Sequence, residues 1–159
     1  MGRRLIVNLG STRIAWRGAG GSDVRVHDGR PGQVIAGVLA GSEPPPEVIV
    51  GSVAAQPVTE EFLAACRANW DLDPCELVAT REACGVRNAY AEPARLGIDR
   101  WAAMIAAYRA HGGAVLLADC GTAVTVDYVA GEGRHVGGLI APGIGLMRKA
   151  LASGTRLAS

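Results

Sequence analysis

The chain has 159 residues, about half of them apolar, and a formal net charge of +1. This length fits one domain or part of a larger fold, and the apolar share predicts a buried core. Near-neutral charge without a basic run argues against a nucleic-acid partner, and no apolar stretch approaches the ~18 residues of a membrane span.

The N-terminus and the cysteines indicate the cellular compartment. The apolar run after Met1 is too short for a secretory signal, so we expect a cytoplasmic protein with no membrane partner. The cysteines form no C-x-x-C pair and have no neighbouring histidine, so free thiols are expected rather than a zinc site. The histidines lack carboxylates at helical spacing and are expected to be surface or structural residues. The cysteines are Cys66, Cys75, Cys84 and Cys120.

The first half of the chain predicts a strand meander followed by alternating helices and strands. Apolar runs rich in Val and Ile, and alternation of polar with apolar residues, predict the strands. Helical spacing of apolar residues predicts the helices, and Thr59 is a favourable starting residue for one of them. In chain order we expect strands at 5–9, 12–17 and 24–27, a helix at 33–39, a loop at 42–46, a strand at 47–53, a helix at 59–70 and a weak strand at 76–79.

The second half predicts a helix, three strands and a last helix. Trp101, Met104 and Tyr108 share one helical stripe, and the Gly112-Gly113 pair ends that helix. Pro142 fits the first turn of the last helix. In chain order we expect an irregular segment at 81–95, a helix at 100–109, strands at 114–119, 123–129 and 135–140, and a helix at 142–151.

One kind of turn occurs twice. Residues 8–12 (NLGST) and residues 119–123 (DCGTA) each follow an apolar strand and precede an alternating one. Glycine allows close backbone approach to a ligand, and the amide and hydroxyl groups of such a turn suit phosphate oxygens. A carboxylate before the glycine can hold a metal ion beside the phosphates. An ordinary hairpin explains either turn alone, whereas two matching copies predict a duplicated unit that clamps a nucleotide between two lobes.

Three further segments reduce the number of protein families that the chain can resemble. They read NAYAEPARLGIDRW at 88–101, DCGTAVTVD at 119–127 and GGLIAPGIGLM at 137–147. In order and spacing they resemble the type III pantothenate kinases of the actin-like ATPase and sugar-kinase superfamily. The resemblance implies an α/β, actin-like (ribonuclease H-like) fold of duplicated lobes with mixed sheets, the first lobe at 1–112 and an incomplete second at 113–159. It also implies a homodimer that phosphorylates pantothenate to 4'-phosphopantothenate with ATP, the first step of coenzyme A biosynthesis.

The resemblance assigns roles to individual residues. Asp99 is the implied general base on the pantothenate hydroxyl, although an N-cap role at the following helix is the alternative. Asp119 is the implied ligand of a monovalent cation, K⁺ or NH₄⁺, and we expect this strand-end carboxylate to be buried and to need such a partner. The implied substrate contacts are Tyr90, Gly97, Ile98, Asp99, Arg100 and Thr155. The implied contacts to ATP with its Mg²⁺ are Asn8, Leu9, Gly10, Ser11, Thr12, Arg13, Gly121 and Thr122.

Two departures from the family leave a second function open. Asn8 stands where the family has Asp, and an amide cannot neutralise Mg²⁺. Family members also continue well past Ser159. The alternative is therefore a catalytically weak or inactive accessory protein that binds nucleotide or pantothenate. A dinucleotide oxidoreductase is disfavoured, because no G-x-G-x-x-G opens a helix after a strand.

Overall fold

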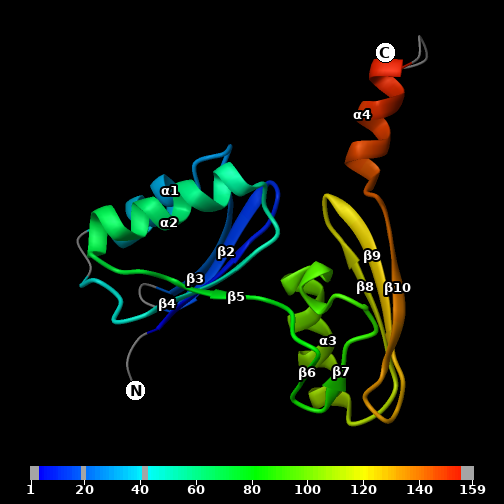
Figure 1. The fold of residues 1–159 in the computed structure, drawn as a ribbon. Helices are drawn as coiled ribbons and strands as arrows, with labels where there is room; N and C mark the ends of the chain where they lie inside the picture. Colours follow the sequence, from blue (N-terminus) through cyan, green and yellow to red (C-terminus); the bar gives the residue numbers. More distant parts are fainter. Residues whose placement is uncertain (1–3, 19–20, 41–42, 155–159) are drawn as a thin grey trace. The chain divides into compact units, whose positions relative to one another are not determined.

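The computed structural model describes residues 4–18, 21–40 and 43–154. It contains two compact units, Met1–Val78 and Ala79–Ser159, and each combines helices with strands (Figure 1). The α/β class is therefore confirmed. The predicted lobe boundary at residue 112 differs from this division, because the helix before it packs against the strands after it. As a division of the complete fold into lobes, that boundary stays a prediction.

The first unit is built on a five-stranded mixed sheet in the order β3-β2-β1-β4-β5. Strand β2 runs antiparallel to both β1 and β3, which confirms the predicted meander. Strands β1, β4 and β5 run parallel, with a helix in each connection. The elements are β1 (Leu5–Leu9), β2 (Arg13–Gly18), β3 (Gly21–Val26), α1 (Pro31–Leu39), β4 (Val48–Ser52), α2 (Gln56–Trp70) and β5 (Cys75–Leu77).

Alternation along β1 decides which face of this sheet is buried. Leu5, Val7 and Leu9 are buried, whereas Ile6 and Asn8 are exposed on the other face. Helices α1 and α2 cover the buried face (Figure 1). The core consists of Leu5, Val7, Leu9, Ile14, Trp16, Ile35, Val48, Val50, Phe62, Leu63 and Cys66. Burial in this core raises the pKa of the Cys66 thiol to about 12.

Prolines account for two helix starts that differ from prediction. Helix α2 begins at Gln56 rather than at Thr59, with Pro57 in its first turn, where the missing N–H costs no hydrogen bond. The Thr59 hydroxyl lies 2.7 Å from that of Ser52 instead. In the second unit, Pro142 ends a strand and the last helix begins two residues later, so its predicted place in that helix is wrong.

The second unit contains a three-stranded antiparallel sheet in the order β10-β9-β8, and a small hairpin of β6 and β7. Helix α3 packs against β8 and β9 and ends, as predicted, at Gly112 in a left-handed conformation with φ 74°. In the described part of the chain, every helix is too short or too polar to cross a bilayer. The elements are β6 (Glu82–Ala83), β7 (Val86–Arg87), the 3-10 turn η1 (Pro93–Arg95), α3 (Ile98–His111), β8 (Val115–Cys120), β9 (Ala123–Val129), β10 (His135–Pro142) and α4 (Ile144–Gly154).

The two units repeat one order of elements. Each contains three consecutive antiparallel strands followed by a helix, β1-β2-β3-α1 in the first and β8-β9-β10-α4 in the second. In both, the glycine-containing turn joins the first strand of the meander to the second. The repetition predicted from the two turns is therefore confirmed at the level of topology.

Candidate active site

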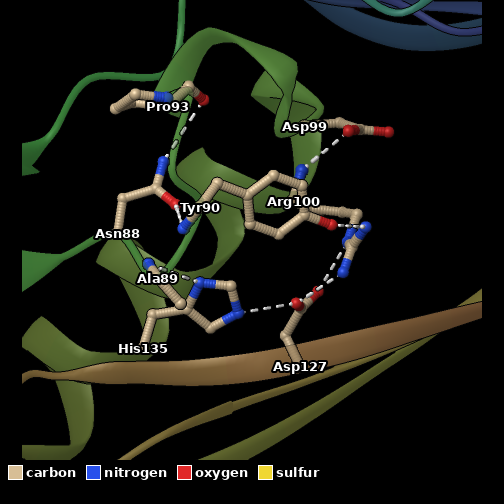
Figure 2. A network of polar contacts seen from close by, with 8 residues as sticks. All are labelled: Asn88, Ala89, Tyr90, Pro93, Asp99, Arg100, Asp127 and His135. Carbon is tan, nitrogen blue, oxygen red and sulfur yellow. Dashed lines mark hydrogen bonds and ion pairs between the residues drawn. The ribbon is translucent and has the colours of Figure 1, made fainter.

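The first turn of α3 carries a buried ion pair with β9. The Arg100 Nε–H group donates to Asp127 Oδ2 at 2.8 Å, and Nη2–H donates to Oδ1 at 2.7 Å (Figure 2). The two side chains are only 9 % and 4 % exposed. Two parallel bonds fix the plane of the guanidinium as well as neutralising its charge. The hydrogen bond to Asp127 is the main cause that raises the pKa of Arg100.

The neighbouring strand β10 leaves room for this pair because it has a glycine there. Gly138 lies opposite Asp127 in the register of the two strands. A Cβ atom at this position would lie 2.2 Å from Asp127 Oδ1 and 2.5 Å from Arg100 Nη2. Gly138 therefore has a steric function in this chain, since any side chain at this position would displace the ion pair.

His135, at the start of β10, is fully buried beside the same carboxylate. Its Nε2 lies 3.1 Å from Asp127 Oδ1, and its Nδ1 lies 3.4 Å from the backbone N of Ala89. A backbone N–H can only donate, so Nδ1 is the acceptor and Nε2 carries the proton. The prediction from helical spacing does not find this partner of His135, because adjacent strands, not a helix, bring the two residues together.

Tyr90 lies next to both Arg100 and His135. Its hydroxyl oxygen is 3.4 Å from Arg100 Nη1, and its ring is inclined by 14° to the imidazole with the centroids 6.2 Å apart. The buried Asn88 holds the backbone of this segment: its Oδ1 accepts the Tyr90 N–H at 3.0 Å, and its Nδ2 donates to the Pro93 carbonyl at 3.3 Å. The side chain of Tyr90 is thus placed by buried neighbours although it is itself only half-buried.

Asp99 presents a carboxylate at the same end of α3. Gly97, not Asp99, occupies the N-cap position, so the alternative N-cap role is wrong. Oδ1 of Asp99 accepts the N–H of Arg100 at 2.7 Å, and Oδ2 accepts no hydrogen bond from a described residue. The side chain is half-buried, which leaves this second oxygen able to take a proton from a bound ligand. The neighbouring Ile98 is buried, so only its backbone is available to a ligand.

The first predicted phosphate turn is held by bonds within the first unit. The Gly10 N–H donates to the Arg13 carbonyl at 2.9 Å, so this amide is not available to a phosphate. His27 is buried, its Nε2–H donates to the Gly10 carbonyl at 3.0 Å, and its Nδ1 accepts the Gly29 N–H at 3.0 Å. The Leu9 side chain belongs to the core. The exposed side chains of this turn are those of Asn8, Ser11, Thr12 and Arg13.

The second predicted phosphate turn packs on the residue that precedes α4. Gly121 donates its N–H to the Ala123 carbonyl at 2.9 Å, and the Thr122 carbonyl accepts the Gly143 N–H at 3.0 Å. A Cβ atom on Gly143 would lie 2.5 Å from the Gly121 carbonyl oxygen, so only glycine allows this approach. Asp119 is exposed at the end of β8. The expectation that this carboxylate is buried is therefore wrong, and its role as a cation ligand stays a prediction.

The comparisons with known proteins decide the family. The sequence model of the type III pantothenate kinases matches residues 5–158. The chain belongs to the type III pantothenate kinase family. A type III pantothenate kinase from Nitrosococcus oceani is 36 % identical over 162 residues, covering 95 % of this chain and 61 % of that protein. One from Azoarcus sp. (strain BH72) is 40 % identical over 157 residues, covering 95 % of this chain and 59 % of that protein.

The chain thus spans about three fifths of the length of these curated relatives. Among solved structures, a conserved protein from Campylobacter jejuni described as a Baf family transcriptional activator matches with a TM-score of 0.55 and 20 % identity. The match covers 96 % of this chain and 61 % of that one. At this identity the likeness concerns the fold alone.

In this member of the type III pantothenate kinase family, the structure brings together Tyr90, Asp99 and Arg100. It places the two predicted phosphate turns in different units, and Thr155 lies outside the described residues. Sequence reasoning assigned no site role to Asp127 and His135, although both lie within or next to the family segments. A polar residue inside an apolar strand, as Asp127 is in β9, is the signal that points to a buried partner.

Proposed function

We propose that this protein transfers the γ-phosphoryl group of ATP to the hydroxyl group of pantothenate, the first step of coenzyme A biosynthesis. Membership of the family supports the proposal. The structural observation that carries it is the position of Tyr90, Asp99 and Arg100 together at the N-terminal end of α3 (Figure 2). Pantothenate has a carboxylate and hydroxyl groups, for which a cationic hydrogen-bond donor and a base are suitable partners, and Arg100 and Asp99 supply them.

The proposed chemistry assigns the proton transfer to Asp99. Its Oδ2 accepts the proton of the pantothenate hydroxyl as the oxygen attacks the γ-phosphorus in line with the departing ADP. Oδ1 remains bonded to the Arg100 N–H, which holds the carboxylate at the start of the helix. Phosphoryl transfer depends mainly on alignment and on electrostatic stabilisation, so a base on a rigid helical turn meets the main requirement.

The nucleotide is assigned to the two glycine turns. Ser11 in the first turn and Thr122 in the second are the exposed hydroxyl residues that the proposal assigns to phosphate oxygens. That both turns engage one triphosphate stays a prediction. Mg²⁺ is usually held by substrate phosphates with one or two protein oxygens. Among the described residues no three His, Cys, Asp or Glu side chains cluster around a metal position. We assign the exposed Asn8 amide oxygen to a nucleotide-bound ion, at the position where the family has Asp.

Three further assignments belong to the proposal on family grounds alone. They are a monovalent cation, K⁺ or NH₄⁺, at the exposed Asp119, a homodimeric assembly, and a cytoplasmic location. An exposed carboxylate at a strand end is an acceptable oxygen ligand for such a cation.

The test is phosphorylation by the purified protein. With ATP, Mg²⁺, K⁺ and pantothenate, we expect ADP release that depends on pantothenate, and a product heavier than pantothenate by one phosphoryl group. Calorimetric binding of both ligands without ADP release would support the accessory-protein alternative. Absence of both binding and turnover would overturn the proposal.

Replacing Asn8 with aspartate is expected to raise kcat. The carboxylate would neutralise part of the metal-ion charge that an amide cannot, and single groups that stabilise charge in a transition state are worth about 10²–10³-fold. We expect a rise of about tenfold or more, with saturation at a lower Mg²⁺ concentration. Asn69→Asp, at an exposed position of α2, is the matched control. An unchanged rate in Asn8→Asp would show that the missing carboxylate at this position does not limit kcat.

A further inference from the structure

His135 is linked to both of the groups that the proposed function assigns to pantothenate, to Tyr90 by a ring contact and to Arg100 through Asp127. Through Nε2–H it bonds to Asp127, which in turn holds the guanidinium of Arg100. Its ring lies nearly parallel to that of Tyr90, within the 4.5–7 Å range of interacting aromatic pairs (Figure 2). The imidazole has no exposed surface. It therefore contacts Asp127 and Tyr90 inside the protein and does not touch a ligand.

The bonds to Asp127 determine which edge of Arg100 remains for a ligand. A guanidinium has five N–H groups. Asp127 occupies the side edge made by Nε and Nη2, and Tyr90 lies near Nη1. The end edge, with one N–H on each of Nη1 and Nη2, is left for a second carboxylate, which can accept both.

We propose that His135 is a positioning residue for pantothenate: it fixes Asp127, and hence the end edge of Arg100, and it supports the ring of Tyr90. The inference rests on the proposed function, in which Arg100 and Tyr90 contact the substrate. The ion pair alone fixes its two side chains relative to each other. The bond from His135 ties the pair to β10, and the Ala89 N–H fixes the imidazole tautomer that can donate to Asp127.

Two substitutions separate the two contacts of His135. His135→Phe keeps an aromatic face beside Tyr90 but cannot donate to Asp127, whereas glutamine can place an amide N–H near the position of Nε2. We expect His135→Phe to weaken pantothenate binding on the order of tenfold, the loss expected for one hydrogen bond to a charged group. His135→Gln should weaken it less. Calorimetry should show ATP affinity within about twofold of wild type in both variants, because a single contact far from the nucleotide changes binding little.

Controls and contrary results separate positioning from a general structural role. His111→Phe and His111→Gln make the same changes at an exposed histidine of α3 and should alter neither affinity. Equal pantothenate affinity in His135→Phe and wild type would overturn this inference while leaving the proposed function intact. Parallel loss of ATP and pantothenate affinity would also overturn it, since general unfolding affects both ligands. A wild-type protein that does not bind pantothenate would overturn both proposals.

A measurement on the unmodified protein covers the case in which the variants do not fold. Nitrogen-15 NMR of the imidazole is expected to show His135 neutral, with its proton on Nε2. Addition of pantothenate should shift the Arg100 Nη signals and leave the Nε–H bond to Asp127 in place. A proton on Nδ1, or Arg100 signals that do not respond to saturating pantothenate, would contradict the proposed positioning.

Discussion

Asp99→Asn is expected to lower kcat for pantothenate phosphorylation by about 10²–10⁴-fold, the usual contribution of a positioned general base. The amide has the shape of the carboxylate, and its oxygen can still accept the Arg100 N–H that Oδ1 accepts now. The start of α3 should therefore be preserved, and only the ability to take a proton is lost. Coupled ADP-release kinetics measure the effect, and calorimetry should give an ATP affinity close to that of wild type.

Glu92→Gln is the matched control for this substitution. Glu92 is an exposed carboxylate of the preceding segment, 3.5 Å from the Nε of Arg95, and the exchange to its amide should leave kcat unchanged. If Asp99→Asn turned over at the wild-type rate, Asp99 would not be the base. A matching loss of thermal stability would instead assign the lower rate to damage at the start of α3.

The elements of the fold could be predicted largely because their patterns are local. The apolar run at 5–9, the glycine turn after it and the alternation at 12–17 give β1 and β2 directly, and the second copy of the turn at 119–123 gives the repeat. The starts of the two helices near Pro57 and Pro142 were predicted less accurately. Pro57 and Pro142 are compatible with a helix start and with a strand or loop, and the surrounding contacts decide between these outcomes.

The same distinction between local patterns and long-range contacts applies to the active-site residues. Asp99 and Arg100 stand in a specific sequence segment, so the resemblance could assign them. The pair of Asp127 with Arg100 spans 27 residues and exists because α3 packs against β9. In β9 Asp127 shares its alternating set with Thr125, whereas the other set is Val124, Val126 and Tyr128, so alternation alone does not predict that Asp127 faces inward. The contact of His135 with Asp127 likewise depends on the pairing of β10 with β9, which the sequence does not reveal.

Asp127→Ala is expected to destabilise the second unit by about 3–5 kcal/mol, the usual cost of leaving one member of a buried ion pair without its partner. Arg100 has a side chain that is 9 % exposed and would keep its charge. Hydrogen exchange of the α3 and β9 backbone amides should then be roughly 10²–10⁴-fold faster, at 1.4 kcal/mol for each factor of ten. Glu132→Ala breaks the exposed pair with Arg134 and should change exchange little.

A double variant tests whether the buried charge is the cause. Arg100→Met removes the guanidinium and retains much of its apolar stem, so Asp127→Ala combined with Arg100→Met should be more stable than Asp127→Ala alone. Replacement of a buried ion pair by apolar residues is often neutral or stabilising, whereas removal of one partner is not. The double variant should nevertheless bind pantothenate poorly, because the proposed carboxylate receptor is gone. Equal stability of the single and double variants would attribute the loss to the cavity left by Asp127 and would contradict the electrostatic explanation.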